Sequence, residues 1–261
     1  MAETFPSNPA DATLTAVRDA VRSRRVSSLE VTEAIMERLE TRGRAVNAIA
    51  GLDPDAGRAD AKAADKVIAA GKTAGVLHGV PLAHKDMFYR PGRPSECGSK
   101  LRQGYQPKVL SGALKRLDQA GAIDVARLNM NEFAYGVTGH NDWTGNVTNP
   151  WNPAHITGGS SSGSGASVAA RANFAALGSD TGGSIRLPAA CCGVTGMKVT
   201  MGRVSRFGAM PLSHSLDTVG PLTRTVADNA LMLSVLAGHD PDDASSARIA
   251  VPDYLAGLEK G

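Results

Sequence analysis

The chain has 261 residues, with 28 basic and 25 acidic side chains and a formal net charge of +3. Hydrophobic residues make up 42% of the sequence and charged residues 20%, which is ordinary for a globular protein with a sizeable core. The small net charge and the lack of a run of five like charges argue against nucleic-acid binding, and no stretch approaches the roughly 18 apolar residues of a membrane span.

The cysteines and the N-terminal segment bear on the cellular compartment in which the protein is found. Cys97, Cys191 and Cys192 are odd in number and two of them are adjacent, so they do not form a disulfide framework, which favours a reducing compartment. Residues 1–14 lack the basic start and apolar core of a signal peptide. We therefore predict a soluble cytoplasmic protein.

The first third of the sequence predicts mainly helices. The Ser27–Glu30 segment fits a capping box, and apolar residues follow it at helical spacing as far as Leu39. The remaining elements expected in this part are a short strand at 46–52, an alanine-rich helix at about 54–70 that stops at Gly71, a short apolar segment at 79–86 that ends in charged residues, and a Pro- and Gly-rich loop at 90–108.

Helices and strands alternate in the rest of the chain. We expect a helix at 110–120, a strand at 122–127, a long loop at 136–159, a helix at 164–173, an apolar run at 174–178 and a helix from a Thr225 cap to Ala237. This alternation predicts an α/β fold with at least some parallel strand pairing. A loop as long as 136–159 inside a compact domain is usually functional or disordered.

Two Gly-Gly-Ser elements, at 158–160 and 182–184, carry the strongest functional signal. Paired glycines allow the backbone to turn sharply and to approach another group closely. The small-residue segment between the two elements can pack, so the region is not a flexible linker. We expect both elements to present serine hydroxyls and backbone N–H groups to a reacting centre.

Other interpretations of the glycine- and serine-rich region are weaker. Gly159–Gly163 matches the G-x-S-x-G nucleophile elbow with Ser161 as nucleophile, but no hydrophobic strand precedes it. Neither glycine stretch ends in the Gly-Lys-Ser/Thr of a phosphate-binding loop, and the six histidines lack zinc-ligand spacing. The sequence therefore predicts no metal and no organic cofactor.

A serine nucleophile needs a base to remove its proton, and Lys85 is one candidate. It directly follows the apolar run 80–83. A lysine at a strand end can reach water and remain charged. A desolvated lysine instead has a lowered pKa and can act as a neutral base near pH 7. The segment alone leaves both interpretations open.

Several segments, taken together, resemble the amidase signature family. They are Gly79–Asp86, Asn149–Trp151, Gly158–Ser161, Asp180–Pro188, Gly193–Lys198 and Ser215–Pro221, in the order and spacing that the family uses. The resemblance extends from about residue 30 to residue 240. A single Gly-Gly-Ser element would be a weak indication, but the whole set is highly specific.

The resemblance implies a fold and a set of site residues. The fold is an α/β mixed twisted sheet with helices on both faces, in one domain spanning 1–261 with N-terminal helices at about 10–70 and a catalytic core at about 75–240. By the resemblance Lys85 is the base, Ser160 the bridging serine and Ser184 the acylated nucleophile. The oxyanion-binding and substrate-binding positions are Thr181, Gly182, Gly183 and Ala134, the last of which is small and leaves room for an acyl group.

The implied activity is hydrolysis of a small-molecule carboxylic amide through a serine acyl-enzyme. Two alternatives remain, namely the A subunit of a tRNA-dependent glutamine amidotransferase and an inactive truncated amidase. Two departures from the family are Ser162, where glycine is more usual, and the length, because members typically run to nearly twice this size. We therefore expect the second half of the sheet to be missing, and either a homodimer or a partner chain to supply it.

Overall fold

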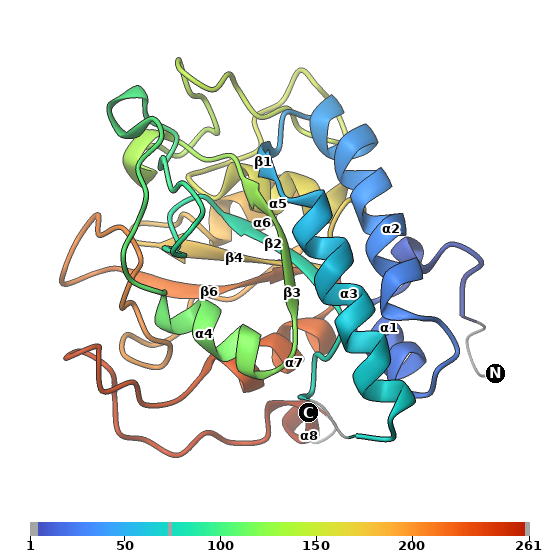
Figure 1. Cartoon of the computed structure of the whole chain (residues 1–261). Coiled ribbons are helices and arrows are strands. Elements are labelled where there is room, and N and C mark those ends of the chain that lie inside the picture. Colours follow the sequence, from blue (N-terminus) through green and yellow to red (C-terminus); the bar gives the residue numbers. More distant parts are fainter. Residues whose placement is uncertain (1–4, 73–74, 259–261) are drawn as a thin grey trace.

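The structure is a computed structural model that describes residues 5–72 and 75–258. Its strands lie in the centre and helices cover both faces (Figure 1), which confirms the predicted α/β class. The strands are β1 (Ile49–Leu52), β2 (Pro81–Lys85), β3 (Ile123–Leu128), β4 (Ala175–Asp180), β5 (Thr195–Gly196) and β6 (Thr218–Thr223). The helices are α1 (Leu14–Arg22), α2 (Ser28–Arg38), α3 (Pro54–Ala69), α4 (Gly112–Gln119), α5 (Ser162–Ala169), α6 (Arg186–Cys192), α7 (Val226–Leu236) and α8 (Tyr254–Leu258).

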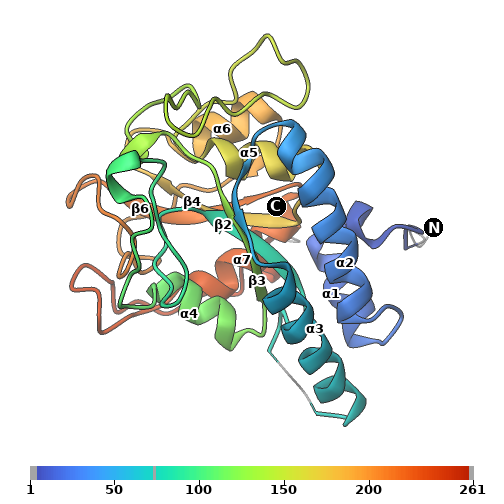
Figure 2. The ribbon, with the colours of Figure 1, turned by 45° about the horizontal axis from the view of Figure 1, so that its top comes forward.

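The strands form two hydrogen-bonded groups of three. β3 pairs antiparallel with β1 and parallel with β2, whereas β6 pairs antiparallel with both β4 and β5. β2 and β4 lie side by side at the junction of the two groups (Figures 1 and 2), although no main-chain ladder joins these two strands. The six strands thus follow the spatial order β1-β3-β2-β4-β6-β5.

Helices cover the strands in layers. In Figures 1 and 2, α5 and α6 lie on one face of β2, β4 and β6, while α4 and α7 lie on the other face. The paired helices α2 and α3 pack beside β3 at one side of the molecule, with α1 close by. The core between these layers is formed by fully buried side chains such as Leu82, Val125, Phe174 and Leu177.

Most of the expected elements are confirmed. The capping box is complete, because Ser27 accepts from the Glu30 amide while the Glu30 carboxylate accepts from the Ser27 amide. Thr225 likewise caps α7 through the Asp228 amide. The strand at 46–52 and the helices at 54–70 and 110–120 occur within a few residues of the predicted bounds. Within 90–108 and 136–159 the structure has no strand and only one short turn of helix.

The helix predicted at 164–173 is wrong in its bounds, since α5 begins at Ser162 and ends at Ala169. It begins early because tertiary contacts override the low helix propensity of glycine. A Cβ on Gly163 would lie 2.6 Å from the Asn129 backbone, so only glycine allows this close approach. It ends early because Arg171 adopts a left-handed conformation, with φ of 55°. Sequence reasoning also missed β6, whose six residues are all buried and lack an alternating pattern.

Side chains complete the hydrogen bonding of β4 along the edge that faces β2. Leu177 of β4 lies opposite Pro221 of β6. Because proline has no N–H to donate, the backbone amide and carbonyl of Leu177 point away from β6 and toward β2. The Ser164 hydroxyl of α5 donates to the Leu177 carbonyl over 3.0 Å. The Ser179 amide donates to the Ser161 hydroxyl, which in turn lies 3.3 Å from the Ser179 carbonyl. The serine-rich helix therefore takes over part of the role of a neighbouring strand.

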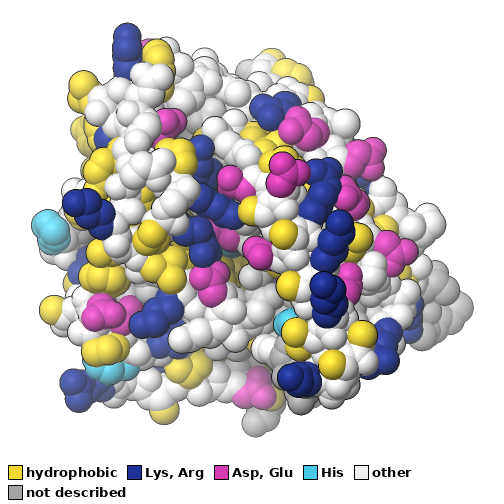
Figure 3. All heavy atoms as spheres, viewed as in Figure 1, with side chains coloured by type: hydrophobic (Ala, Val, Ile, Leu, Met, Phe, Trp, Pro, Cys, Tyr) yellow, Lys and Arg dark blue, Asp and Glu magenta, His cyan; other side chains and the backbone are white. Residues whose placement is uncertain are grey.

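Basic and acidic side chains are interspersed with apolar ones on the face shown in Figure 3, as the small net charge suggests. In the stretches 5–72 and 75–258, no helix combines the length and apolarity that crossing a bilayer requires.

Replacing Ser164 with alanine tests the role of the serines at the edge of β4. The change leaves the buried Leu177 carbonyl without a partner, so we expect a loss of roughly 1–3 kcal/mol in the free energy of unfolding. Ser167→Ala is the matched control, because Ser167 is equally buried in α5 but its hydroxyl donates only to the Ser164 carbonyl inside the helix. Urea unfolding of the two variants should show the larger loss for Ser164→Ala. Equal losses would contradict the role of the serine.

Candidate functional site

Lys85 ends β2 with its amine buried at the junction of the two groups of strands. The residue is 1% exposed, and its Nζ donates to the Ser160 hydroxyl over 2.7 Å and to the Ser179 hydroxyl over 2.8 Å. None of the ion pairs formed by residues 5–72 and 75–258 includes Lys85. Of the two interpretations of Lys85 that the sequence left open, the lysine that reaches water is therefore wrong.

The surroundings of Lys85 favour its neutral form. Burial lowers the pKa of Lys85 to about 7, although Cys97, Asp180 and Asp217 act in the opposite direction. A substantial fraction of the amine is then uncharged at neutral pH. A neutral amine has a lone pair. At the same distance of 2.7 Å, Lys85 Nζ can then accept a proton from the Ser160 hydroxyl instead of donating one.

Ser160 is fully buried and follows a cis peptide bond from Gly159. Its carbonyl accepts a hydrogen bond from the Asn131 amide over 3.2 Å. Asn131 also requires glycine at position 159, because a Cβ there would lie 2.1 Å from Asn131 Oδ1. These contacts fix the backbone that presents the Ser160 hydroxyl to Lys85.

Ser184 lies in the second Gly-Gly-Ser turn, 6% exposed and just before α6. Its carbonyl accepts from the Ser161 amide over 3.1 Å, so the two Gly-Gly-Ser turns lie side by side. Among the described residues, no hydrogen bond joins the hydroxyls of Ser160 and Ser184. The structure thus contains the contact between Lys85 and Ser160, and it brings Ser184 to the neighbouring turn.

Asp180 shapes this turn, a role that sequence reasoning missed. Its buried carboxylate accepts from the amides of Gly183, Ile185 and Arg186 and from the Arg186 guanidinium. Burial acts to raise the pKa of Asp180, but the hydrogen bonds from Arg186 and from the backbone outweigh it and hold the pKa below its usual value. A charged group that follows a strand and precedes a glycine turn was the available signal.

The turn has backbone donors that could bind an anion. The Gly183 amide donates to the Asp180 carboxylate over 2.9 Å. No hydrogen bond between described residues occupies the amides of Gly182 and Ser184. The Thr181 hydroxyl donates to Asp217 over 2.5 Å and so ties the turn to the loop before β6.

Ala134 connects to Ser160 through the backbone. It is 2% exposed, adopts a left-handed conformation with φ of 59°, and donates its amide to the Asn131 carbonyl. Asn131 in turn donates to Ser160, as described above.

A cavity of about 380 Å³ borders Ser179, the residue whose hydroxyl accepts from Lys85. Its lining includes Met87, Arg206, Phe207, Met210, Asp217 and Thr218.

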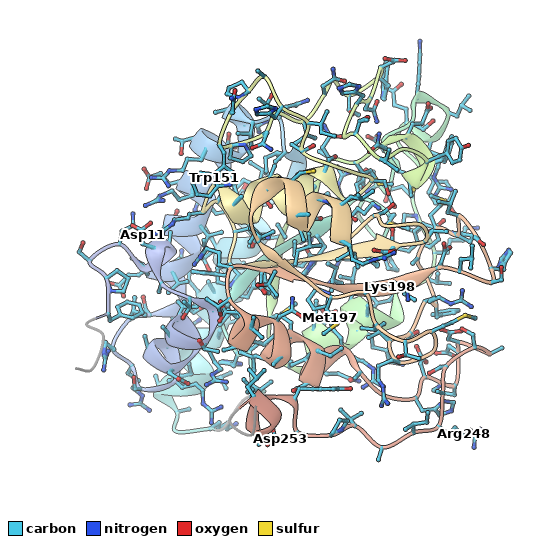
Figure 4. The ribbon with its side chains drawn as sticks, turned by 180° about the vertical axis from the view of Figure 1, so that it is seen from behind. Asp11, Trp151, Met197, Lys198, Arg248 and Asp253 are labelled. Atoms are coloured by element: carbon cyan, nitrogen blue, oxygen red, sulfur yellow. The ribbon has the colours of Figure 1, made fainter. Side chains whose placement is uncertain are left out.

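The other residues that the sequence analysis discussed make contacts typical of structural residues. The Ser161 hydroxyl is buried against the backbone of Ser179, so the alternative that made it the nucleophile gains no support. Cys192 is buried with its thiol on the Thr157 carbonyl, and its own carbonyl accepts from the Trp151 ring. Figure 4 shows Trp151 beside α6 on the back of the molecule. Within the described part of the chain, no group of three His, Cys, Asp or Glu side chains could hold a metal ion.

Comparisons with known proteins show the family to which the chain is related. The sequence profile of the Amidase family matches residues 30–260. The A subunit of the glutamyl-tRNA(Gln) amidotransferase from Geobacter sulfurreducens is 48% identical over 94% of this chain and 50% of its own length. The chain therefore spans about half the length of the curated relatives that it matches.

Solved structures share the fold as well. The peptide amidase from Stenotrophomonas maltophilia superposes with a TM-score of 0.90 at 35% identity, over 98% of this chain and 54% of that one. A chain from a vestigial protein complex that bears on the origins of an s-triazine catabolic enzyme gives a TM-score of 0.92 at 37% identity, over 96% of this chain and 55% of that one. With the profile match covering most of its length, the chain belongs to the amidase signature family, whose enzymes act on carbon–nitrogen bonds.

Proposed function

We propose that the chain carries the catalytic residues of an amidase that cleaves a carboxylic amide through an acyl-enzyme on Ser184. The observation that carries this proposal is the buried Lys85 amine, 2.7 Å from the Ser160 hydroxyl and with a pKa lowered to about 7. A base that is partly neutral at the working pH, in contact with a hydroxyl, is what activation of a serine requires.

The reaction begins with a proton relay. Neutral Lys85 accepts the proton of the Ser160 hydroxyl, and Ser160 accepts the proton of Ser184 as the Ser184 oxygen attacks the amide carbonyl carbon. This step requires the Ser184 hydroxyl to come within hydrogen-bond reach of Ser160. The carbonyl oxygen gains negative charge, and the amides of Gly182 and Ser184 are available to stabilise it, a contribution typically worth about 10²–10³ in rate for each donor.

Collapse of the tetrahedral intermediate breaks the carbon–nitrogen bond. The proton stored on Lys85 returns through Ser160 to the leaving nitrogen, so an amine or ammonia departs and Ser184 keeps the acyl group. Water then attacks the ester carbon and gives up a proton to the same relay. The bond between the acyl carbon and the Ser184 oxygen breaks, and the relay returns the proton to that oxygen. The products are the carboxylic acid and the free enzyme, and every proton is accounted for by Lys85, Ser160, Ser184 and water.

A second candidate function is that of the A chain of a glutamine amidotransferase. Its support is the 48% identity to the protein from Geobacter sulfurreducens. In that case the amide is glutamine and a partner chain uses the released ammonia. Glutamine hydrolysis that appears only after partner chains are added would favour this function, whereas turnover of simple amides by this chain alone would favour the first. The absence of both activities and of any labelling at Ser184 would favour an inactive amidase.

Ser184→Ala should abolish acyl-enzyme formation and leave the fold intact, because only a hydroxyl is removed from the turn. Incubation with a fluorophosphonate followed by peptide mass spectrometry should place the adduct on Ser184 in the unmodified chain and show none in the variant. Ser161→Ala serves as the matched control and should still be labelled at position 184. An adduct on Ser160 or Ser161 would contradict the assignment.

Lys85 sets the expected pH dependence. The neutral amine is the active form and its pKa is about 7, so kcat/KM should fall as the pH drops through 7 and level off above it. Lys85→Ala should reduce turnover by roughly 10²–10⁴-fold, the usual contribution of a general base. Lys85→Arg should not restore it, because a guanidinium stays charged. Steady-state kinetics between pH 5 and 9 provide the measurement, and near-normal turnover by Lys85→Arg would exclude the base role.

A further inference from the structure

The junction between β2 and β4 is held by side chains instead of a main-chain ladder. His84 of β2 makes one of these bridges: its Nδ1 accepts a hydrogen bond from the Leu177 amide of β4 over 3.2 Å. Asn173, just before β4, makes another, because its amide nitrogen donates to the Ala83 carbonyl over 3.0 Å, and Lys85 makes a third through Ser179. All three bridging side chains are buried.

The His84 bridge lies immediately next to the candidate base. Along β2, His84 is followed by Lys85; along β4, Leu177 is followed two residues later by Ser179, which accepts from Lys85. The residue numbers of the contacting pairs increase together on both strands, so β2 and β4 run parallel. The distance between the ends of these strands, where Lys85 meets Ser179, therefore depends on the hydrogen bond made one residue earlier.

We infer that His84 is a positioning residue, which fixes the end of β2 against β4 and so holds the Lys85 amine between Ser160 and Ser179. This inference rests on the proposed function for its catalytic consequence, but the bridge itself can be tested without turnover. The ring is 4% exposed and touches no reacting group in the proposed chemistry, so its effect on the reaction passes through Lys85.

The bridge needs His84 in its neutral form. Nδ1 can accept from Leu177 only when it carries no proton, which places the ring proton on Nε2. Burial lowers the pKa of His84 to about 4. Among the charged groups that face the ring, Asp124 of β3 and Asp118 of α4 act to raise this pKa, and Arg90 and Arg93 of the segment after β2 act to lower it.

The sign of the pH effect follows from this lowered value. The unfolded chain binds a proton at His84 near the ordinary pKa of about 6.5, whereas the folded chain does so only near 4. The stability that neutral His84 contributes is complete above about pH 6.5 and is lost as the pH falls to about 4. This range lies below the titration of Lys85, so the two groups can be separated in one pH series.

The test replaces the ring with groups that do or do not offer an acceptor in the same place. His84→Asn puts an amide oxygen close to the position of Nδ1, His84→Gln moves it one carbon further, and His84→Leu removes it. Hydrogen exchange of the Leu177 amide, read by mass spectrometry of a peptide that contains it, reports the bridge. The fall of kcat/KM at low pH, called the acid limb below, has a midpoint that reports the pKa of Lys85.

We expect His84→Asn to keep Leu177 protected and the acid limb within a few tenths of its original pH. His84→Leu should speed Leu177 exchange at least tenfold, shift the acid limb and lower kcat at least tenfold with little change in KM. His78→Leu is the matched control, since it removes an imidazole bonded to the Ala64 carbonyl, remote from Lys85, and should change neither the Leu177 exchange nor the acid limb.

Three results would overturn the inference: Leu177 exchange unchanged in His84→Leu, an acid limb unchanged in His84→Leu, or His84→Asn behaving like His84→Leu. If His84→Leu does not fold, the comparison of His84→Asn with His84→Gln decides, and equal behaviour of the two rejects the inference. Full turnover by Lys85→Ala would instead reject the proposed function, while the exchange of Leu177 would still decide whether His84 bridges the strands.

Discussion

A buried amine with no carboxylate partner among the residues that the structure describes is the constraint on which this structure depends. Lys85 Nζ contacts two serine hydroxyls, and hydroxyls compensate a charge far less well than an ion pair would. The amine therefore loses its proton readily, which is unfavourable for stability at neutral pH but is what a general base requires. Two strands and the first Gly-Gly-Ser turn must meet to hold these contacts.

The serine-rich segment resolves a second constraint, which is the polar edge of β4. A strand edge that no ladder covers leaves buried amides and carbonyls that must find partners elsewhere. Ser161, just before α5, and Ser164 of α5 supply several of them, and His84 supplies one from β2. The close approach to the strand needs Gly178 in β4, because a Cβ there would lie 2.8 Å from the Ser161 hydroxyl. One tract of small residues thus both supports the sheet and presents Ser160.

Sequence patterns identified the elements whose cause is local. The capping box at Ser27, the Thr225 cap and the alanine-rich α3 depend on neighbouring residues, and each was predicted nearly in place. The elements missed or misplaced depend on distant contacts. β6 is buried on both faces and shows no alternation, and α5 owes its early start to close packing against Asn129.

The same division applies to the candidate site. The family resemblance identified Lys85, Ser160 and Ser184 as candidate catalytic residues. It was not possible to predict the burial of Lys85 from the apolar run before it, because such a run is equally compatible with an exposed strand end. The roles of Asp180 and His84 also escaped sequence reasoning, because each depends on the amides that the fold turns toward it. A histidine in a strand carries no mark of that environment, and the one signal for Asp180 was its place between an apolar run and a glycine turn.

Direct titration of the Lys85 amine tests the central claim without relying on any substrate. The chain can be produced with ¹³C at lysine Cε, and the Lys85 resonance can be identified by its loss in Lys85→Met. We predict that this resonance titrates near pH 7 while exposed lysines titrate near the ordinary value of about 10.4. A Lys85 resonance that stays in the ammonium form up to about pH 10 would contradict the account.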